Sequence, residues 1–199
     1  MSTKRLALVT SSIREPRLNP AITSHVHEMS KAICLAQQTS LETIDLRSIS
    51  LPPDTEPEVP SHLPMEGTSS HYAFTHTREW SNLVSQYDCF IFVTPQYNWS
   101  VPAGLKNALD YLFHEWKGKS AGIVTYGVRG GGKAANHLRD ILNGLRMKVA
   151  PTMPALPIPT NSVEVGQDEK DKWDRAGLNL NIETMVKEVL EASQEIRQP

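Results

Sequence analysis

Cysteine is scarce in this chain: Cys34 and Cys89 are the two cysteines among 199 residues. Their separation matches neither a metal-binding nor a redox spacing, and each lies among apolar neighbours. We therefore expect two buried free thiols, as in proteins of a reducing compartment such as the cytoplasm.

Long hydrophobic runs are also missing. The longest, residues 6–9 and 89–93, are far too short to cross a bilayer. The N-terminus has a basic start but only four apolar residues before polar ones, whereas a signal peptide needs a longer apolar core and a small-residue cleavage site. The sequence thus predicts a cytoplasmic protein with no membrane partner.

An excess of basic residues is absent as well, since the net charge is −2 and no stripe of Lys and Arg occurs. Such a stripe is the usual mark of a nucleic-acid-binding surface, so we expect no nucleic-acid partner. There is no internal repeat, no Ser/His/Asp set, no catalytic carboxylate pair and no metal motif. A chain of this length with 39% hydrophobic residues fits a single domain over residues 1–199.

Short apolar segments alternate with amphipathic segments along the chain, which predicts strands alternating with helices. The expected strands are residues 4–10, 39–46, 88–94, 120–126 and 147–150, and the expected helices are residues 18–38, 76–87, 102–114, 133–145 and 168–197. This alternation is typical of β-α-β units, whose helices cover both faces of a parallel sheet. We therefore predict a doubly wound α/β domain with a five-stranded parallel sheet, and a site at the carboxyl ends of its strands.

Two proline-rich segments, residues 51–64 and 151–159, interrupt this pattern. Proline lacks a backbone N–H and cannot occupy the middle of a helix or an inner strand. We expect connecting segments at both places.

The loop after the first expected strand, residues 10–19, leads directly into a helix. Its serine hydroxyls, Arg14, Arg17 and the free backbone N–H groups of a helix start suit a phosphate group. The alternative is a helix capped by Ser or Asn, with both arginines in solvent.

The loop after the third expected strand, residues 94–102, carries two amides and two aromatic side chains. An extended backbone beside a tyrosine can line a flat ring and hydrogen-bond its edge. The alternative is helix capping, with Ser100 as the cap and Pro102 in the first turn. Capping does not account for Gln96, Tyr97 and Asn98, which favour a planar polar ligand.

The loop after the fourth expected strand has four glycines within residues 126–132, so its backbone can approach a ligand closely or adopt positive φ. The alternative is a flexible connection. Gly127, Gly132 and Lys133 also match most of a P-loop, but Ala134 lacks the hydroxyl that binds Mg²⁺. No acidic residue stands at the carboxyl end of the third strand, so we do not expect ATP hydrolysis.

Together these loops resemble a known family. The segment TPQYNWSVPAGLKNALDYL, residues 94–112, resembles the signature of the NADPH-dependent FMN reductases, a flavodoxin-like group that includes some quinone and azo reductases. SSIREPRLN, residues 11–19, resembles their phosphate loop, and TYGVRGGG, residues 125–132, resembles their glycine loop. The resemblance covers roughly residues 4–150 and implies a flavodoxin-like three-layer sandwich with strand order 2-1-3-4-5.

The resemblance also implies residue roles for an FMN cofactor. The phosphate would be held by Ser12, Arg14 and Asn19, the isoalloxazine ring would lie along Pro95, Gln96, Tyr97 and Asn98, and Gly127, Gly130 and Gly131 would approach its other side. Many members carry Ser at the position of Arg17, so this chain is expected to lose a hydroxyl contact there. The added positive charge of Arg17 either compensates for that loss or lies in solvent.

The activity implied is an NAD(P)H oxidoreductase of the ping-pong type. A hydride from NADPH or NADH would pass to the FMN N5. The reduced FMN would then pass the electrons to a small-molecule acceptor such as a quinone, free flavin, azo compound or metal oxyanion. No catalytic side chain is expected, because the cofactor carries this chemistry. The resemblance implies a homodimer, for which the apolar stripe of residues 105–112 is either core or interface.

Two other functions compete with this one. A flavin-binding redox sensor with a protein partner would use the unmatched proline-rich loop and the tail at 168–199. A one-electron carrier would differ by accumulating a flavin semiquinone.

Overall fold

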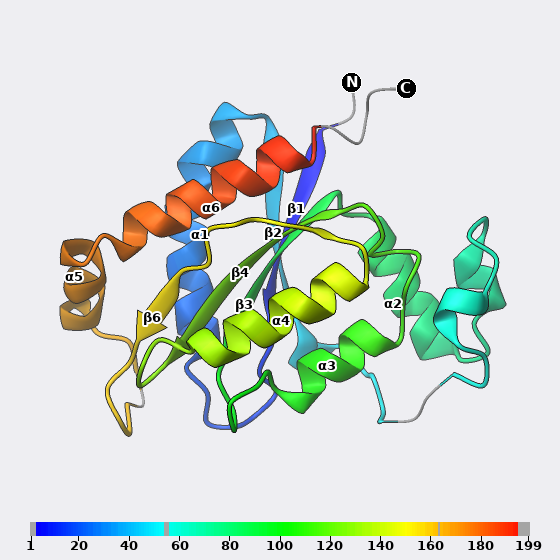
Figure 1. Ribbon diagram of the computed structural model, residues 1–199, viewed down its shortest axis with the longest axis horizontal. Coiled ribbons are helices and arrows are strands. Elements are labelled where there is room, and N and C mark those ends of the chain that lie inside the picture. The colour runs from blue at the N-terminus through cyan, green and yellow to red at the C-terminus, as the bar shows by residue number, and fades with distance from the viewer. Residues whose placement is uncertain (1–2, 54–55, 163, 195–199) are drawn as a thin grey trace.

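The computed structural model describes residues 3–53, 56–162 and 164–194, and it contains a parallel sheet covered by helices on both faces (Figure 1). The strands are β1 (Lys4–Thr10), β2 (Thr39–Asp45), β3 (Cys89–Pro95), β4 (Ser120–Gly127), β5 (Lys148–Val149) and β6 (Ala155–Pro157). The order is β2-β1-β3-β4-β5, with β6 also paired to β4. The predicted order 2-1-3-4-5 is confirmed, but within the described residues the sheet has six strands and not five.

The sixth strand lies in the second proline-rich segment, where we had expected only a connection. Strands β5 and β6 both run parallel to β4, at its two ends. A proline is tolerated there because an edge strand needs only half of its backbone groups for pairing. Pro154 supplies its carbonyl to the Thr125 N–H at 2.9 Å, and Ile158 N–H donates to Gly127.

Between β5 and β6 the chain turns toward the last helix. Thr152 donates from its backbone N–H and its hydroxyl to the two carboxylate oxygens of Glu188, at 3.0 and 2.8 Å. The outer edge of β4 is therefore paired at both ends and interrupted in the middle.

The helices largely follow the predicted segments. They are α1 (Asn19–Ala36), α2 (Thr75–Ser85), α3 (Ala103–Asp110), α4 (Gly132–Gly144), α5 (Gln167–Arg175) and α6 (Leu178–Ala192). The tail was predicted as one helix over 168–197, but Gly177 at φ +71° divides it in two, and residues 195–197 lie outside the described part. Helix α3 ends at Asp110, short of the predicted 114. The reason is that Trp116 Nε1 donates a hydrogen bond to the Leu109 carbonyl, and the chain continues in turns.

The core has two halves because successive side chains of a strand face opposite sides. Leu6 and Leu8 of β1 face one side, where they pack with α1, α5 and α6. Ala7 and Val9 face the other side, which α2, α3 and α4 cover (Figure 1). Both sides of each inner strand are thus buried, which accounts for the unbroken apolar runs of the sequence.

The apolar stripe of α3 belongs to the core and not to a free surface. Leu105, Leu109, Leu112 and Trp116 are each at most 1% exposed. The choice left open between core and interface is therefore decided for the core.

The first proline-rich segment contains the short 3₁₀ turn η2 (Pro60–His62), and two further turns, η1 (Leu46–Ser48) and η3 (Thr68–His71), lie on either side of it. Its start is fixed to α3 by Asn107 Nδ2, which donates to the carbonyls of Leu51 and Pro52. Residues 54–55 lie outside the described part.

The two cysteines are buried free thiols, as predicted. Burial raises the pKa of Cys34 to about 11 and that of Cys89 to about 12. No helix in the described part of the chain is both long and apolar enough to cross a membrane, and the same residues contain no cluster of three His, Cys, Asp or Glu side chains placed for a metal ion.

Candidate active site

Three loops meet at the carboxyl edge of the sheet, because β1, β3 and β4 are parallel neighbours that end together. Backbone hydrogen bonds join them: Ser11 N–H donates to Val93 O at 3.2 Å, and Gln96 N–H donates to Tyr126 O at 3.0 Å. The three predicted segments thus form one continuous surface.

Asn19 determines the shape of the first loop. It is fully buried, its Nδ2 donates to Val93 O at 3.0 Å, and its Oδ1 accepts from the Ser12 N–H at 2.6 Å. Both ends of its amide are therefore bonded to the protein, and its direct role in holding a phosphate stays a prediction. The two hydrogen bonds of Asn19 hold residues 12–18 folded back over the start of α1.

Arg14 and Ser12 connect the first loop to the second. The Ser12 hydroxyl lies 2.9 Å from the Tyr97 hydroxyl, and the Arg14 guanidinium stacks over the Tyr97 ring at 4.1 Å. Arg14 is exposed and has no carboxylate partner among the described residues, so its donors are available for an anion.

Arg17 does not lie in solvent, and its charge is already paired. Its side chain is 8% exposed; it donates to both carboxylate oxygens of Asp45 at 2.8 and 2.6 Å and to the Ser12 carbonyl at 2.5 Å. Burial alone would raise the pKa of Asp45, but hydrogen bonds from Arg17 and from the Arg47 backbone outweigh it and lower that pKa. Arg17 therefore ties the phosphate loop to the end of β2.

The second loop is a tight hairpin. Tyr97 and Ser100 exchange backbone hydrogen bonds of 2.9 and 3.0 Å, and the two residues between them, Asn98 and Trp99, have φ of +46° and +69°. Pro95, at the buried end of β3, pairs with Tyr126 in the register of the sheet. The Ser100 hydroxyl bonds His137 Nδ1 at 2.7 Å and so ties the hairpin to α4, whereas the sequence suggested that it caps α3.

Gln96 precedes α3 in the chain, but its side chain caps α4. Its Oε1 accepts from the backbone N–H groups of Lys133 and Ala134, at 3.0 and 3.2 Å. These are two of the free donors at the start of α4, which has no side-chain cap from its own N-cap residue, Gly131. In a P-loop such donors would bind phosphate, so their use by Gln96 is a further argument against a triphosphate site.

Two positions of the third loop require glycine, because a side chain there would collide with a neighbouring strand. Gly130 and Gly131 have φ of +77° and +86°. A Cβ on Gly130 would lie 2.9 Å from Ala155 O, and one on Gly131 would lie 3.0 Å from Tyr126 O. Gly132 is different, since nothing lies within 4 Å of its Cβ position.

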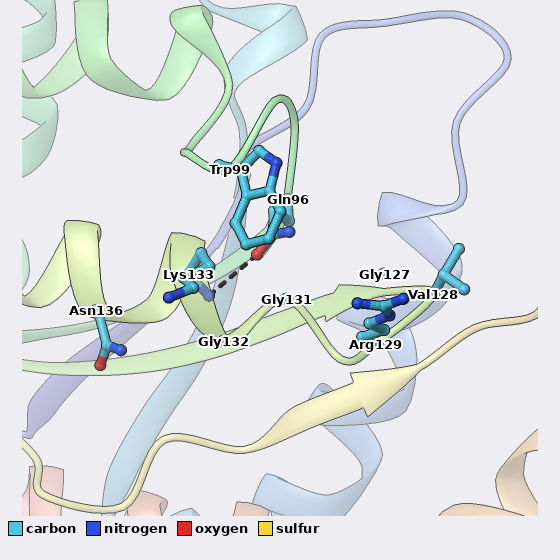
Figure 2. A pocket seen from close by; sticks show the side chains of 9 residues that line it. All are labelled: Gln96, Trp99, Gly127, Val128, Arg129, Gly131, Gly132, Lys133 and Asn136. Atoms are coloured by element: carbon cyan, nitrogen blue, oxygen red, sulfur yellow. Dashed lines mark hydrogen bonds between the residues drawn. The ribbon is translucent and has the colours of Figure 1, made fainter.

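A cavity of about 770 Å³ opens between the second and third loops (Figure 2). Of the predicted site residues, it is lined by Gln96, Gly127 and Gly131. The other predicted residues do not line it, and Gly130 packs on β6.

Sequence reasoning missed the rest of this lining. Those residues are Trp99, Val128, Arg129, Gly132, Lys133 and Asn136. The available signal was helical spacing: Lys133 and Asn136 share the face of α4 opposite the buried Leu138 and Leu142.

Comparison with known proteins matches this arrangement to one family. The family model described as NADPH-dependent FMN reductase matches residues 4–159. The chain belongs to this family. An NAD(P)H-dependent FMN reductase of Schizosaccharomyces pombe is 42% identical over 166 residues, covering 82% of this chain and 78% of that protein. An NAD(P)H-dependent FMN reductase of Saccharomyces cerevisiae is 37% identical over 169 residues, covering 82% and 86%.

The fold agrees with solved structures of the same kind. The flavoenzyme NAD(P)H:(acceptor) oxidoreductase FerB of Paracoccus denitrificans aligns with a TM-score of 0.63 at 21% identity, over 95% of this chain and 98% of that one. The chain is therefore an oxidoreductase enzyme with a flavodoxin-like fold that uses FMN and NAD(P)H.

The residues present fit an FMN phosphate in the first loop. Among the described residues, the backbone N–H groups of Ile13, Glu15 and Arg17 have no acceptor, and the donors of Arg14 are free. The Glu15 carboxylate is engaged by Arg47, and Arg17 lies nearby, so its negative charge is compensated. Free N–H groups at the positive end of α1 with one unpaired guanidinium are a suitable donor set for a phosphate dianion.

Proposed function

We propose that this protein transfers a hydride from NAD(P)H through bound FMN to a small acceptor, in two half-reactions that share one site. The observation that carries the proposal is the cavity of about 770 Å³, lined by the second and third loops, beside a first loop whose free donors suit a phosphate. The Ser12–Tyr97 contact at 2.9 Å joins the two places, so one ligand with a phosphate and a ring can span both. Bound FMN supplies hydride acceptance at N5 and electron delivery to the acceptor.

The side chains position this chemistry. Ser12, Arg14 and the loop N–H groups would hold the phosphate, while the two hydrogen bonds of Asn19 keep the loop in shape. The Gln96 amide nitrogen has no acceptor among the described residues, so it can donate to a polar ring edge while its oxygen caps α4. Residues 95–98 would hold the ring on one side, and Gly127 and Gly131 would approach it from the other wall.

The charge of the cavity suits a pyridine nucleotide. Arg129 and Lys133 line it, no carboxylate does, and in the described part of the chain neither cation pairs with an acid. Two unpaired cations attract the phosphates of NADPH or NADH.

The visible spectrum tests the proposal. Purified protein should bind FMN and show its absorption bands; NADPH should bleach them, and a quinone should restore them. Parallel lines in double-reciprocal plots should show the two half-reactions. Protein that gains no flavin bands after incubation with FMN would exclude the proposal.

The homodimer stays a prediction, and the apolar stripe first considered for it lies in the core. The cytoplasmic location also stays a prediction, and the two free thiols support it. The redox-sensor alternative loses part of its support, because the described part of the tail forms α5 and α6, whose apolar side chains pack into the core.

A further inference from the structure

Trp99 occupies a backbone position that favours glycine. It is the second of two consecutive residues at positive φ in a two-residue hairpin turn, where Asn-Gly is the strongly preferred pair. A large side chain in this conformation is a genuine outlier, because its Cβ crowds the following carbonyl. Strain of this kind concentrates at functional sites.

Burial does not compensate for this strain. The Trp99 side chain is 66% exposed, which is unusual for the largest apolar side chain. The hairpin itself is held by other residues: Ser100 bonds His137, and Tyr97 bonds Ser12. The turn would therefore keep its place with glycine at position 99.

The indole instead forms one wall of the cavity. Figure 2 shows it beside Gln96 and above the start of α4, with Gly131 and Gly132 below. Lys133 Nζ lies 5.7 Å from the ring centre, a cation–π contact that favours this orientation of the ring.

We propose that Trp99 determines specificity for planar ring acceptors, by stacking its indole on the ring of a quinone-like molecule. This rests on the proposed function and names its acceptor class. The quinone takes two electrons and two protons to become a hydroquinone; the hydride from NAD(P)H supplies both electrons and one proton, and water supplies the other. Stacking on an exposed indole selects flat aromatic molecules over compact inorganic oxidants.

The test compares Trp99→Gly with the matched variant Trp99→Phe in FMN-loaded protein. For 1,4-naphthoquinone, kcat/KM should fall about tenfold in Trp99→Gly, mainly through KM. For ferricyanide, kcat/KM should fall about threefold at most. Two ferricyanide ions are reduced per NADPH, because each takes one electron. Trp99→Phe should keep most of the quinone preference, since it retains a ring.

Two readouts do not depend on turnover. Binding of 1,4-naphthoquinone to the oxidised protein without NADPH should weaken about tenfold in Trp99→Gly. The melting temperature of Trp99→Gly without FMN should equal or exceed that of wild type, because glycine relieves the positive φ. A merely structural role would instead lower stability and affect both oxidants alike.

The outcomes separate the two proposals. Wild-type protein that binds no FMN would overturn the proposed function and this inference together. Flavin-loaded wild type that oxidises NADPH, with the same quinone-to-ferricyanide ratio in Trp99→Gly, would overturn this inference alone.

Discussion

Arg17 shows how one residue can depart from a family pattern and still serve the same loop. Its guanidinium is paired with Asp45 and bonded to the Ser12 carbonyl, so it acts through the loop's conformation. Replacing it with Ser, which many family members carry at this position, would leave Asp45 and the loop without those hydrogen bonds.

We predict that Arg17→Ser lowers the unfolding free energy by about 2 kcal/mol, the usual loss for hydrogen bonds to charged groups. The double variant Arg17→Ser with Asp45→Ser should recover part of this, because no uncompensated carboxylate remains. Urea unfolding of the two single variants and the double variant measures the coupling, and strictly additive losses would contradict a direct pair.

The same pair predicts a pH dependence. Because the folded-state pKa of Asp45 is lowered, its contribution is present above its ordinary pKa of about 3.9 and is lost as pH falls through the lower folded value. The stability gap between wild type and Arg17→Ser should therefore close in acid.

Arg14 is the residue through which the phosphate assignment is best tested. We predict that Arg14→Ala weakens FMN binding about tenfold, because a charge-assisted contact to phosphate is lost. Arg139→Ala is the control: it removes an exposed guanidinium on α4 that does not line the cavity. Fluorescence titration with FMN gives both dissociation constants, and equal values for Arg14→Ala and wild type would refute the assignment.

At the scale of elements, the glycine loop and β6 depend on each other. We predict that Gly130→Ala lowers the unfolding free energy by about 2 kcal/mol, since its Cβ would meet the Ala155 backbone and its φ is positive. Gly132→Ala, two residues along, should stay within about 0.5 kcal/mol of wild type because its Cβ position is open. Chemical denaturation of both variants tests the contrast, and similar losses would show that the packing on β6 is not responsible.

The predictability of the elements follows from where their signals lie. The strands and helices with strong apolar periodicity were found, since buried runs such as those of β1 and β3 are local features. Strand β6 was missed because it forms only by pairing with β4, which the sequence of residues 155–157 does not indicate. The division of the tail at Gly177 was marked by a glycine, but the charged pattern continued across it.

The site divides in the same way. It could be predicted that the three loops meet at one edge of the sheet, because parallel strands bring their carboxyl ends together. Contacts between loops could not: the cap on α4 comes from Gln96, 37 residues away in the chain. The wall formed by Trp99 also depends on a turn conformation that its sequence disfavours.

At the scale of the whole molecule, the partly buried Lys119 should make stability depend on pH. Burial lowers its pKa to about 8, against an ordinary value of about 10.4, while its Nζ donates to Val84 O at 2.8 Å. Between these values the unfolded chain holds a proton that the folded chain does not, so stability rises with pH. Below about pH 8 both states are charged, and the cost of burial is fully present.

We predict that wild type gains about 2 kcal/mol relative to Lys119→Met as pH rises from 7.5 to about 10.5. The difference between the two proteins isolates Lys119, because their tyrosines titrate alike. Urea midpoints across this range measure it, and a constant difference would contradict a neutralised lysine.

The interrupted edge of β4 has a consequence for assembly. A long unpaired edge is a template on which another chain can add a strand. Here the outermost pieces are β5 and β6, two and three residues long, with prolines at 151, 154 and 157 that offer no N–H. Thr152 between them is bonded to α6. This edge is therefore a poor template for strand addition by another copy of the chain, which lowers the tendency to fibrous aggregation.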